Sequence, residues 1–274
     1  MISESGATQD LGLLGGHNVE DPDVRVSVVI PMLDEAGTVE ALLDGCQDAL
    51  EGVATFEICV VNDGSTDATA DVLSGYRAAR PDLRMTVVTH VRPAGQSAAV
   101  HSGVRASRGS LICTLDGDGQ NPPSELPKLL APLLASDRPK TLGLVAGQRL
   151  RRQDPPHKLI ASRMANGLRR ALLKDGTRDT GCGLKAFRRD AFLALPFFNH
   201  MHRYLPALFQ RDGWDVAHCD VAHAERSSGR SKYTNIGRAI VGLTDLLGVA
   251  WLVRRRRSIA PGDVSVSFDE ASSP

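Results

Sequence analysis

Short apolar runs alternate with segments of helical periodicity through the first half of the chain. The runs are rich in β-branched residues, as in strands, and the segments between them repeat apolar residues every three or four positions, as in helices. The predicted strands are residues 26–30, 56–61, 85–89, 111–115 and 141–146, and the predicted helices are residues 36–50, 68–79, 96–106 and 123–134. Parallel neighbours need crossover connections, so this alternation predicts an α/β fold with a doubly wound, mainly parallel sheet.

The hydrophobic pattern also divides the chain into regions. Residues 1–23 and 258–274 are polar without periodicity and are predicted to be disordered, and the folded domain is predicted to cover residues 24–233. In the second half of this domain we expect a basic helix over residues 155–173 and a strand over residues 214–221.

A long apolar helix with a basic end is predicted for residues 234–257. Asp245 interrupts its apolar residues, and the uninterrupted apolar part is shorter than the about 20 residues that a bilayer requires. Trp251 and the arginines at 254–257 suit the headgroup region of an anionic membrane, so we interpret the segment as an amphipathic helix on the membrane surface. The alternative is an amphipathic helix that packs on the sheet and exposes its basic end.

Carboxylate side chains follow three of the predicted strands. Asp116 and Asp118, with Gln120 after them, follow the fourth strand, while Glu35 and Asp63 follow the first and the second. In a parallel sheet these strand ends share one edge, where ligands bind. Mg²⁺ and Mn²⁺ prefer oxygen ligands, so Asp116 and Asp118 predict a metal site for a diphosphate. The alternative is turn and N-cap chemistry, for which Asp-Gly sequences are also common.

Composition and missing motifs argue against several classes of protein. The formal net charge is zero, which gives no general attraction to nucleic acid, and no nucleic-acid partner is expected. The sequence has no phosphate-loop motif and no Gly-x-Gly-x-x-Gly motif opening a helix, which argues against a phosphate-loop triphosphatase and a dinucleotide-binding dehydrogenase. The five cysteines are widely spaced without a Cys-x-x-Cys pair, and the first 24 residues lack the pattern of a secretory signal. A cytoplasmic protein with reduced cysteines is therefore expected.

Four motifs in the first half resemble those of family 2 inverting glycosyltransferases, which have the GT-A fold. They read Val-Val-Ile-Pro-Met-Leu-Asp-Glu, Val-Val-Asn-Asp-Gly-Ser-Thr-Asp, Gly-Gln-Ser-Ala-Ala-Val-His-Ser-Gly and Leu-Asp-Gly-Asp-Gly-Gln-Asn-Pro-Pro. Residues 179–190 and 223–233 resemble the dolichol-phosphate mannosyltransferase-like branch, which makes polyprenyl-phosphate sugars. The resemblance covers residues 24–255 and implies a GT-A (Rossmann-like) fold.

The resemblance implies a binding place for a nucleotide-sugar donor. The residues implied to contact this donor are Pro31, Glu35, Asp63, Asp116, Gly117 and Arg149. Pro31 and Glu35 would line the pocket for the base and ribose, and Asp63 would contact the nucleoside. The family usually has Tyr-Asn where Leu33 and Asp34 stand, so the choice between a GDP and a UDP donor stays open.

The resemblance also implies the metal ligands and the catalytic residues. Asp116, Asp118 and Gln120 would hold Mg²⁺ or Mn²⁺ against the diphosphate, where such an ion stabilises the leaving group as a Lewis acid. The residues implied to take part in catalysis are Asp118, Asp179, Arg226 and Lys232. Asp179 is a candidate for positioning or polarising the acceptor or the sugar, with an N-cap or a buried salt bridge as the alternative.

A cluster of basic residues indicates how a charged acceptor would be held. Arg226, Arg230 and Lys232 lie within seven residues, among glycine and serine, just before the last predicted helix. A lipid phosphate is ionised at neutral pH, with a second pKa of about 6, and therefore needs cations more than it needs a general base. The alternative is a solvated basic loop.

Together these features predict a metal-dependent inverting transferase that is cytoplasmic and peripheral on the inner face of the membrane. It would move a sugar from a nucleotide-sugar to a polyprenyl phosphate. Many members of the family carry transmembrane helices after the catalytic domain and this sequence shows none, so the surface helix or a membrane-protein partner is expected to hold it at the membrane. One alternative is transfer to a glycan hydroxyl, which requires a carboxylate base, and another is a non-catalytic nucleotide-sugar-binding protein.

Overall fold

The computed structural model describes residues 21–149, 167, 169–223 and 235–255. The strands in this part are β1 (Val26–Met32), β2 (Phe56–Asn62), β3 (Met85–Thr89), β4 (Leu111–Thr114), β5 (Leu142–Arg149), β6 (Lys185–Arg188) and β7 (Asp215–Val221). The α-helices are α1 (Val39–Leu50), α2 (Thr69–Ala79), α3 (Gln96–Ala106), α4 (Leu126–Leu134), α6 (Arg189–Leu193), α7 (Leu205–Arg211) and α8 (Asn235–Arg254). Two short 3₁₀ helices are η1 (Pro123–Glu125) and η2 (Met201–Arg203).

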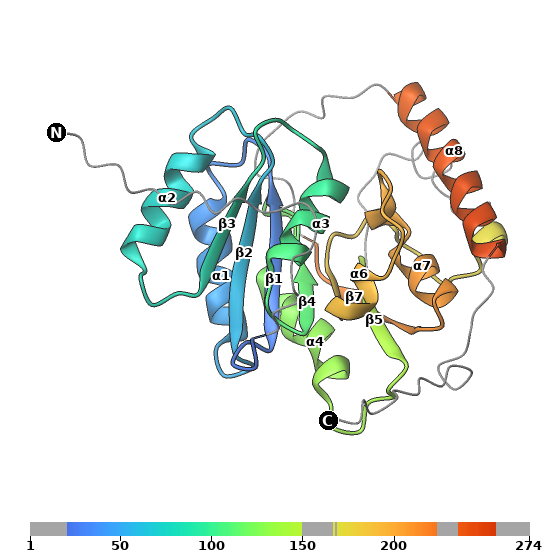
Figure 1. Ribbon diagram of the computed structural model, residues 1–274, viewed down its shortest axis with the longest axis horizontal. Coiled ribbons are helices and arrows are strands. Elements are labelled where there is room, and N and C mark those ends of the chain that lie inside the picture. Colours follow the sequence, from blue (N-terminus) through green and yellow to red (C-terminus); the bar gives the residue numbers. More distant parts are fainter. Residues whose placement is uncertain (1–20, 150–166, 168, 224–234, 256–274) are drawn as a thin grey trace, which may run out of the picture.

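The described strands form one sheet in the order β3-β2-β1-β4-β6-β5-β7 (Figure 1). β1 pairs in parallel with β2 and β4, β2 with β3, and β5 with β7, whereas β6 runs antiparallel between β4 and β5. This arrangement confirms the predicted α/β fold with a mainly parallel sheet. The strand order reverses between β1 and β4, so a ligand-binding crevice is expected outside the carboxyl ends of these two strands.

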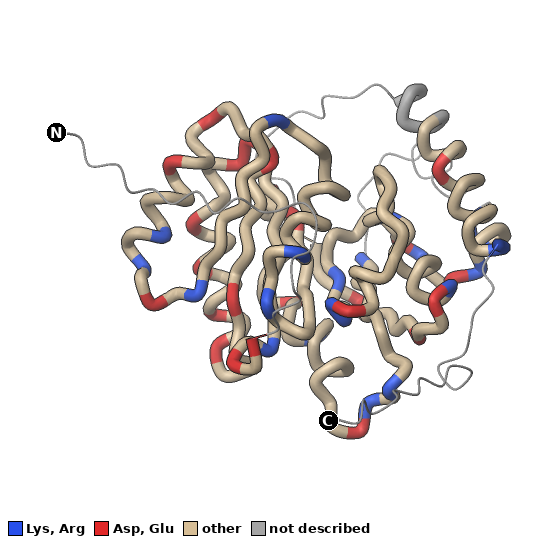
Figure 2. The backbone as a smooth tube through the Cα atoms, in the orientation of Figure 1, with Lys and Arg blue, Asp and Glu red and all other residues tan. Residues whose placement is uncertain are grey.

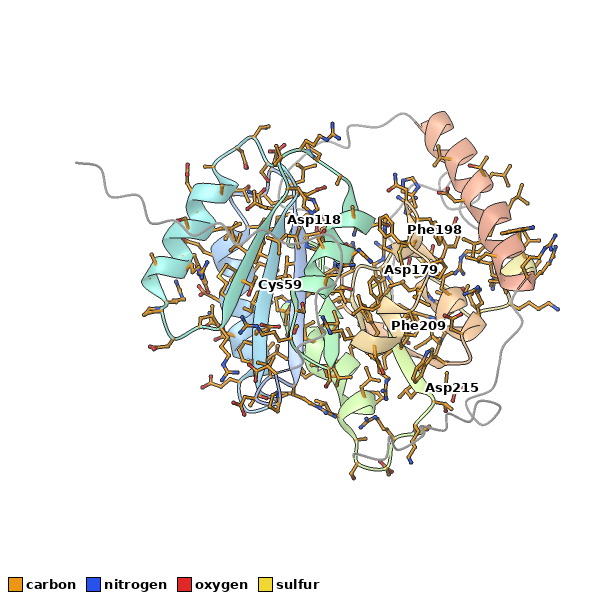
Figure 3. All side chains as sticks on the ribbon, viewed as in Figure 1. Cys59, Asp118, Asp179, Phe198, Phe209 and Asp215 are labelled. Atoms are coloured by element: carbon orange, nitrogen blue, oxygen red, sulfur yellow. The ribbon has the colours of Figure 1, made fainter. Side chains whose placement is uncertain are left out.

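Helices cover both faces of the sheet, and the side chains between the layers form two apolar clusters. Successive residues of a strand point to opposite faces, so Val28 packs in one cluster and Val29 in the other. The first cluster joins the sheet to α1, α2 and α4, and the second joins it to α3, α6, α7 and α8. Cys59 and Phe209 are fully buried in the second cluster (Figure 3). Burial of the strands on both faces explains why they read as continuous apolar runs.

The predicted elements of the first half are confirmed with small shifts at their ends. The helix predicted from residue 36 begins at Val39, and the fifth strand extends to Arg149. The strand predicted from residue 214 begins at Asp215. Residues 21–23 were expected to be disordered, but they form a turn in which the backbone N–H of Asp21 donates to the Arg108 carbonyl at 3.3 Å.

The sequence pattern does not predict β6, α6, η2 and α7. β6 is four residues long and reads Lys-Ala-Phe-Arg, which is too short to show a periodicity. Its place in the sheet is set by antiparallel pairing, in which Thr114 of β4 lies opposite Lys185. This pairing brings the residues just before β6 to the carboxyl end of β4.

α8 packs on the second cluster and also exposes apolar side chains. Leu246, Val249 and Ala250 are buried against the rest of the protein. The exposed apolar residues of this helix, which we call the α8 face, are Val241, Leu243, Leu247 and Trp251, and each is 43–58% exposed. α8 is therefore apolar on two sides and less amphipathic than predicted. Among the described helices none combines the length and the apolar character needed to cross a membrane.

Several predictions fall on residues outside the described part of the chain. They are the disorder of residues 1–20 and 258–274, most of the helix over residues 155–173, and the roles of Arg226, Arg230 and Lys232. The phosphate-binding roles of these three basic residues therefore stay predictions.

Candidate active site

Two aspartates after β4 form the acidic centre of the site. Asp116 accepts hydrogen bonds from Gln96 Nε2 at 2.6 Å and from Asn121 Nδ2 at 3.1 Å. Asp118 Oδ1 accepts the backbone N–H of Gln120 at 3.1 Å. Burial raises the pKa of Asp116, and the charge of Asp118 raises it further. A cation beside the two carboxylates would relieve this repulsion.

Two glycines allow the chain to pass close to Asp116. A Cβ on Gly117, between the two aspartates, would lie 2.8 Å from the Pro31 carbonyl oxygen. A Cβ on Gly183, just before β6, would overlap Asp116 Oδ2. The carboxylate is thus enclosed by the end of β1 and by the segment that leads into β6, and neither side leaves room for a side chain.

A buried ion pair joins Arg149, at the end of β5, to Asp179. Arg149 Nε lies 2.5 Å from Asp179 Oδ2, and Arg149 Nη2 lies 2.9 Å from Asp179 Oδ1. The side chains are 15% and 7% exposed, and Asp179 raises the pKa of Arg149. Asp179 therefore forms the buried salt bridge that was its alternative interpretation, and it fixes the guanidinium of Arg149 in one orientation.

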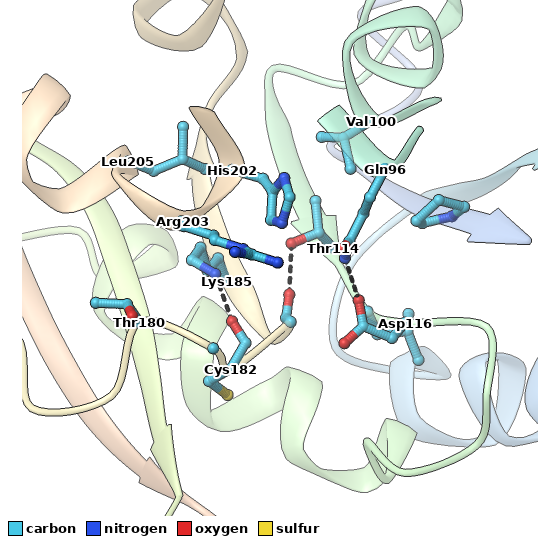
Figure 4. Close-up of a pocket in the computed structure, with 14 residues that line it drawn as sticks. Gln96, Val100, Thr114, Asp116, Thr180, Cys182, Lys185, His202, Arg203 and Leu205 are labelled. Carbon is cyan, nitrogen blue, oxygen red and sulfur yellow. Dashed lines mark hydrogen bonds between the residues drawn. The ribbon is translucent and has the colours of Figure 1, made fainter. Parts of the chain in front are cut away.

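A cavity of about 390 Å³ opens beside Asp116 (Figure 4). Its lining residues are Pro31, Gln96, Val100, Thr114, Leu115, Asp116, Thr180, Gly181, Cys182, Gly183, Lys185, His202, Arg203 and Leu205. They come from the ends of β1 and β4, from α3, from the segment around the start of β6, and from η2 and the start of α7. Only Pro31 and Asp116 of these residues were assigned to the site from the sequence.

Lys185, His202 and Arg203 are polar residues of this cavity that sequence reasoning missed. Lys185 is 5% exposed and its ammonium donates to the Cys182 carbonyl. His202 bonds to Ser97 Oγ through Nδ1 at 2.7 Å, and burial lowers its pKa to about 3. Lys185 lies in a motif of the resembling family, but its place in the cavity follows from the antiparallel β6. His202 and Arg203 lie outside every element and motif that the sequence predicts.

His223, the last described residue before the predicted basic loop, also lies at the edge of the site. Burial and the charge of Arg149 lower its pKa, while the charges of Asp118 and Asp179 oppose this effect. Its Nδ1 atom is buried and has no hydrogen-bond partner among the described residues. His223 therefore lies where the charges of Asp118 and Asp179 act on it, a position that the sequence did not reveal.

Asp63 lies at the carboxyl end of β2 and holds the loop that follows β3. Its carboxylate accepts the backbone N–H groups of Ala94 and Gly95, each at 2.8 Å. Oδ1 also lies 2.6 Å from Nδ1 of His90. Asp63 is 3% exposed, so the structure shows it supporting the loop, and a contact with a nucleoside stays a prediction.

Leu33 and Asp34, the two residues that depart from the family pattern, lie in the segment after β1. Asp34 has a φ of 56°, a left-handed conformation in which Asn and Asp are enriched. Its Oδ1 accepts the backbone N–H of Thr66 at 2.7 Å, which lowers the pKa of Asp34. Leu33 is 43% exposed, and the backbone N–H of Glu35 donates to Thr69 Oγ1 at 3.0 Å. Asp34 thus keeps the backbone geometry that Asn would give, while Leu33 presents an aliphatic surface.

Residues 27–195 match the family described as Glycosyl transferase family 2, and this segment is more than half of the chain. The chain belongs to this family. It is 33% identical over 218 residues to undecaprenyl-phosphate 4-deoxy-4-formamido-L-arabinose transferase of Yersinia pestis (strain Pestoides F), with 79% of this chain and 65% of that protein covered. It is 35% identical over 209 residues to the transferase of the same name from Edwardsiella ictaluri (strain 93-146), with 76% and 62% covered. The chain therefore spans slightly less than two thirds of the length of these relatives.

Solved structures of other glycosyltransferases share the fold of this family 2 member. Glucosyl-3-phosphoglycerate synthase from Mycobacterium tuberculosis, in complex with Mn²⁺, UDP and phosphoglyceric acid, matches with a TM-score of 0.62 and 22% identity over 86% of this chain and 80% of that one. A mannosyltransferase from Pyrobaculum calidifontis, in complex with GDP-Man and Mn²⁺, matches with a TM-score of 0.60 and 22% identity over 87% and 66%. The predicted GT-A fold is confirmed.

Proposed function

We propose that this protein transfers a sugar from a GDP- or UDP-sugar to a polyprenyl phosphate, with inversion and with a divalent metal ion. The observation that carries the proposal is the pair Asp116 and Asp118 at the strand-order reversal, next to the bidentate Arg149–Asp179 pair. The names of the undecaprenyl-phosphate transferases that resemble the chain support the lipid acceptor.

The residues around Asp116 fit a Mg²⁺ or Mn²⁺ ion. Within the described residues there is no group of three or more His, Cys, Asp or Glu that could enclose a metal. Mg²⁺ is usually held by one or two carboxylates together with substrate phosphates, and Asp116 and Asp118 offer such a pair, with the Gln120 side chain as a further oxygen donor. When bound, the ion stabilises the negative charge of the departing diphosphate.

The Arg149–Asp179 pair favours an acceptor that is already ionised. A carboxylate held by two N–H groups of a guanidinium has a stabilised charged form and is a poor general base. A hydroxyl acceptor would need such a base, whereas a phosphate oxygen does not. An oxygen of the lipid phosphate would form the new bond to the anomeric carbon, and the electron pair of the breaking bond would leave with the diphosphate. Arg226 and Lys232 are proposed to hold the acceptor phosphate.

The α8 face and the arginines after it support a peripheral position on the cytoplasmic side of the membrane. Leu247 and Trp251 are 55% and 58% exposed, and Figure 2 shows basic residues at the C-terminal end of the same helix. Apolar side chains that enter the headgroup region together with basic residues beside anionic lipids are the pattern of an interfacial helix. A membrane-protein partner would use the same surface.

Replacing both Leu247 and Trp251 with serine is expected to weaken binding to vesicles that contain anionic lipid by about tenfold or more, because partial burial of each side chain contributes on the order of 1 kcal/mol. Co-sedimentation with vesicles of defined composition measures the affinity. Val91→Ser removes an exposed apolar side chain after β3 and serves as the matched control. Unchanged binding of the double variant would contradict the interfacial helix.

A transfer assay tests the function directly. The full chain is incubated with labelled GDP- and UDP-sugars, a short-chain polyprenyl phosphate and Mg²⁺ or Mn²⁺, with and without a chelator. We expect label in an organic-extractable product that mild acid releases, and no such product in the chelator sample. No lipid product with any common donor would overturn the proposal, and transfer to a glycan hydroxyl with indifference to the lipid phosphate would replace it.

A further inference from the structure

We propose that Lys185 and Arg203 form a phosphate-binding position on the wall of the cavity that faces Asp116. This inference rests on the proposed function, because it names which groups of the two substrates the cavity receives. Figure 4 shows the side chains of Lys185 and Arg203 on one side of the cavity and Asp116 with Gln96 on the other. The cavity wall is therefore divided into an acidic side, suited to a cation, and a basic side.

The amino group of Lys185 is buried, and its contacts leave room for a ligand. The residue is 5% exposed, and one N–H of its ammonium donates to the Cys182 carbonyl. An ammonium has three N–H donors, and among the described residues no other hydrogen bond and no ion pair of this group is present. Burial lowers the pKa of Lys185 and the charges of Asp116 and Asp179 raise it, so an anionic ligand at this position would favour the charged form of the side chain.

Arg203 is held at its backbone but not at its guanidinium. η2 is fixed by the bond of His202 to Ser97 Oγ at 2.7 Å and by the pair of His200 with Asp245 at 2.8 Å. In the part of the chain that the structure describes, the Arg203 guanidinium has no hydrogen bond and no carboxylate partner, although it lines the cavity. A planar fork of N–H donors matches the oxygens of a phosphate.

The charges around the cavity indicate an anionic ligand group. The charges of Asp116 and Asp118 would be balanced by the divalent ion, and the charge of Asp179 is balanced by Arg149. His202 is neutral, since burial lowers its pKa to about 3. Arg203 then remains as a positive charge on the wall, and the amino group of Lys185 beside it is a second group whose charged form an anionic ligand would favour. The proposed reaction supplies phosphate oxygens from two sources, the diphosphate of the donor and the phosphate of the acceptor.

Arg203→Gln is the first variant of the test, because it removes a partly exposed charge and leaves the buried Lys185 in place. Arg203→Lys keeps the positive charge but replaces the planar guanidinium with an ammonium group. Arg77→Gln, on an exposed position of α2, is the matched control. Loss of a charge-assisted hydrogen bond is expected to weaken phosphate binding about tenfold or more in Arg203→Gln, and less in Arg203→Lys. Arg77→Gln is expected to bind like the wild type.

Three measurements distinguish the sources. Calorimetric titration gives the Kd for UDP and for GDP with Mn²⁺, thermal shifts at constant ionic strength report inorganic phosphate, and the transfer assay gives the KM for a short-chain polyprenyl phosphate. Weaker binding confined to the nucleoside diphosphates assigns the position to the donor. Weaker binding of inorganic phosphate and a higher acceptor KM, with unchanged nucleotide Kd, assign it to the acceptor.

Unchanged values in all three measurements would overturn the inference. If Arg203→Gln does not fold, Arg203→Lys carries the same comparison. The nucleotide and inorganic phosphate titrations require no turnover. A wild-type protein that binds these ligands through Arg203 but forms no lipid product would therefore contradict the proposed function and leave this position intact.

Discussion

Replacing Asp116 with asparagine is expected to lower the rate of sugar transfer by about 10³-fold while making the metal-free protein more stable. A bound divalent ion supplies several kcal/mol of charge stabilisation, and each 1.36 kcal/mol changes a rate about tenfold. An amide carries no charge and is a weaker ligand for Mg²⁺, so most of this stabilisation is lost. The rate is measured at saturating donor, acceptor and Mg²⁺, and the affinity for Mn²⁺ is measured in parallel.

The gain in stability follows from the raised pKa of Asp116. Burial and the charge of Asp118 raise the pKa of this group in the folded protein above its unfolded value, so the ionised form destabilises the fold. The stability contribution of such a group is present at low pH and is lost as the pH rises through the folded pKa. Asp116→Asn avoids this loss, and Gln96 and Asn121 have amides that can turn to face the new side chain.

Thermal unfolding with a chelator present checks this effect. At pH 7 the Tm of Asp116→Asn is expected to exceed that of the wild type by about 2–4 °C, and the difference is expected to shrink as the pH falls toward about 4. Asp71→Asn, on an exposed position of α2, is the control. A wild-type transfer rate in Asp116→Asn, and likewise in Asp118→Asn, would contradict the metal site.

The acidic side of the site, formed by Asp116 and Asp118, could be predicted from the sequence because both residues follow the end of one strand. A run of apolar residues that stops at Asp116 and Asp118 places both carboxylates at the ligand-binding edge of any parallel sheet, whatever the order of the strands. Local pattern also predicted the strands and helices of the first half, since each of these elements is long enough to show its periodicity.

The basic side of the site, formed by Lys185 and Arg203, could not be predicted from the sequence because it depends on contacts between segments that are distant in the chain. Lys185 reaches the cavity only because the four-residue β6 inserts antiparallel between β4 and β5. Arg203 reaches it because η2 packs on α3 through Ser97 and His202, which are 105 residues apart in the chain. Tyr204, next to Arg203, is buried, and no periodicity in the sequence separates the residue that faces the cavity from its neighbours.

The ion pair of Arg149 with Asp179 joins residues 30 positions apart, and breaking it is expected to have the largest effect on stability. Arg149→Gln leaves the carboxylate of Asp179, which is 7% exposed, without its partner. Removal of one partner of a buried pair costs about 3–5 kcal/mol, which urea unfolding of the variant measures. Transfer activity is expected to fall by about 10²-fold, because Arg149 is proposed to contact the donor as well.

The double variant Arg149→Gln with Asp179→Asn separates the two roles of the pair. It removes both charges and leaves two amides that can bond to each other, so most of the lost stability is expected to return. Activity is not expected to return, because the cation that faces the phosphates is still missing. If the double variant regained both stability and transfer rate, the pair would be a structural support, and the proposed contact between Arg149 and the donor would be wrong. A variant that is stable but inactive would instead show that Asp179 orients a guanidinium whose target is the substrate.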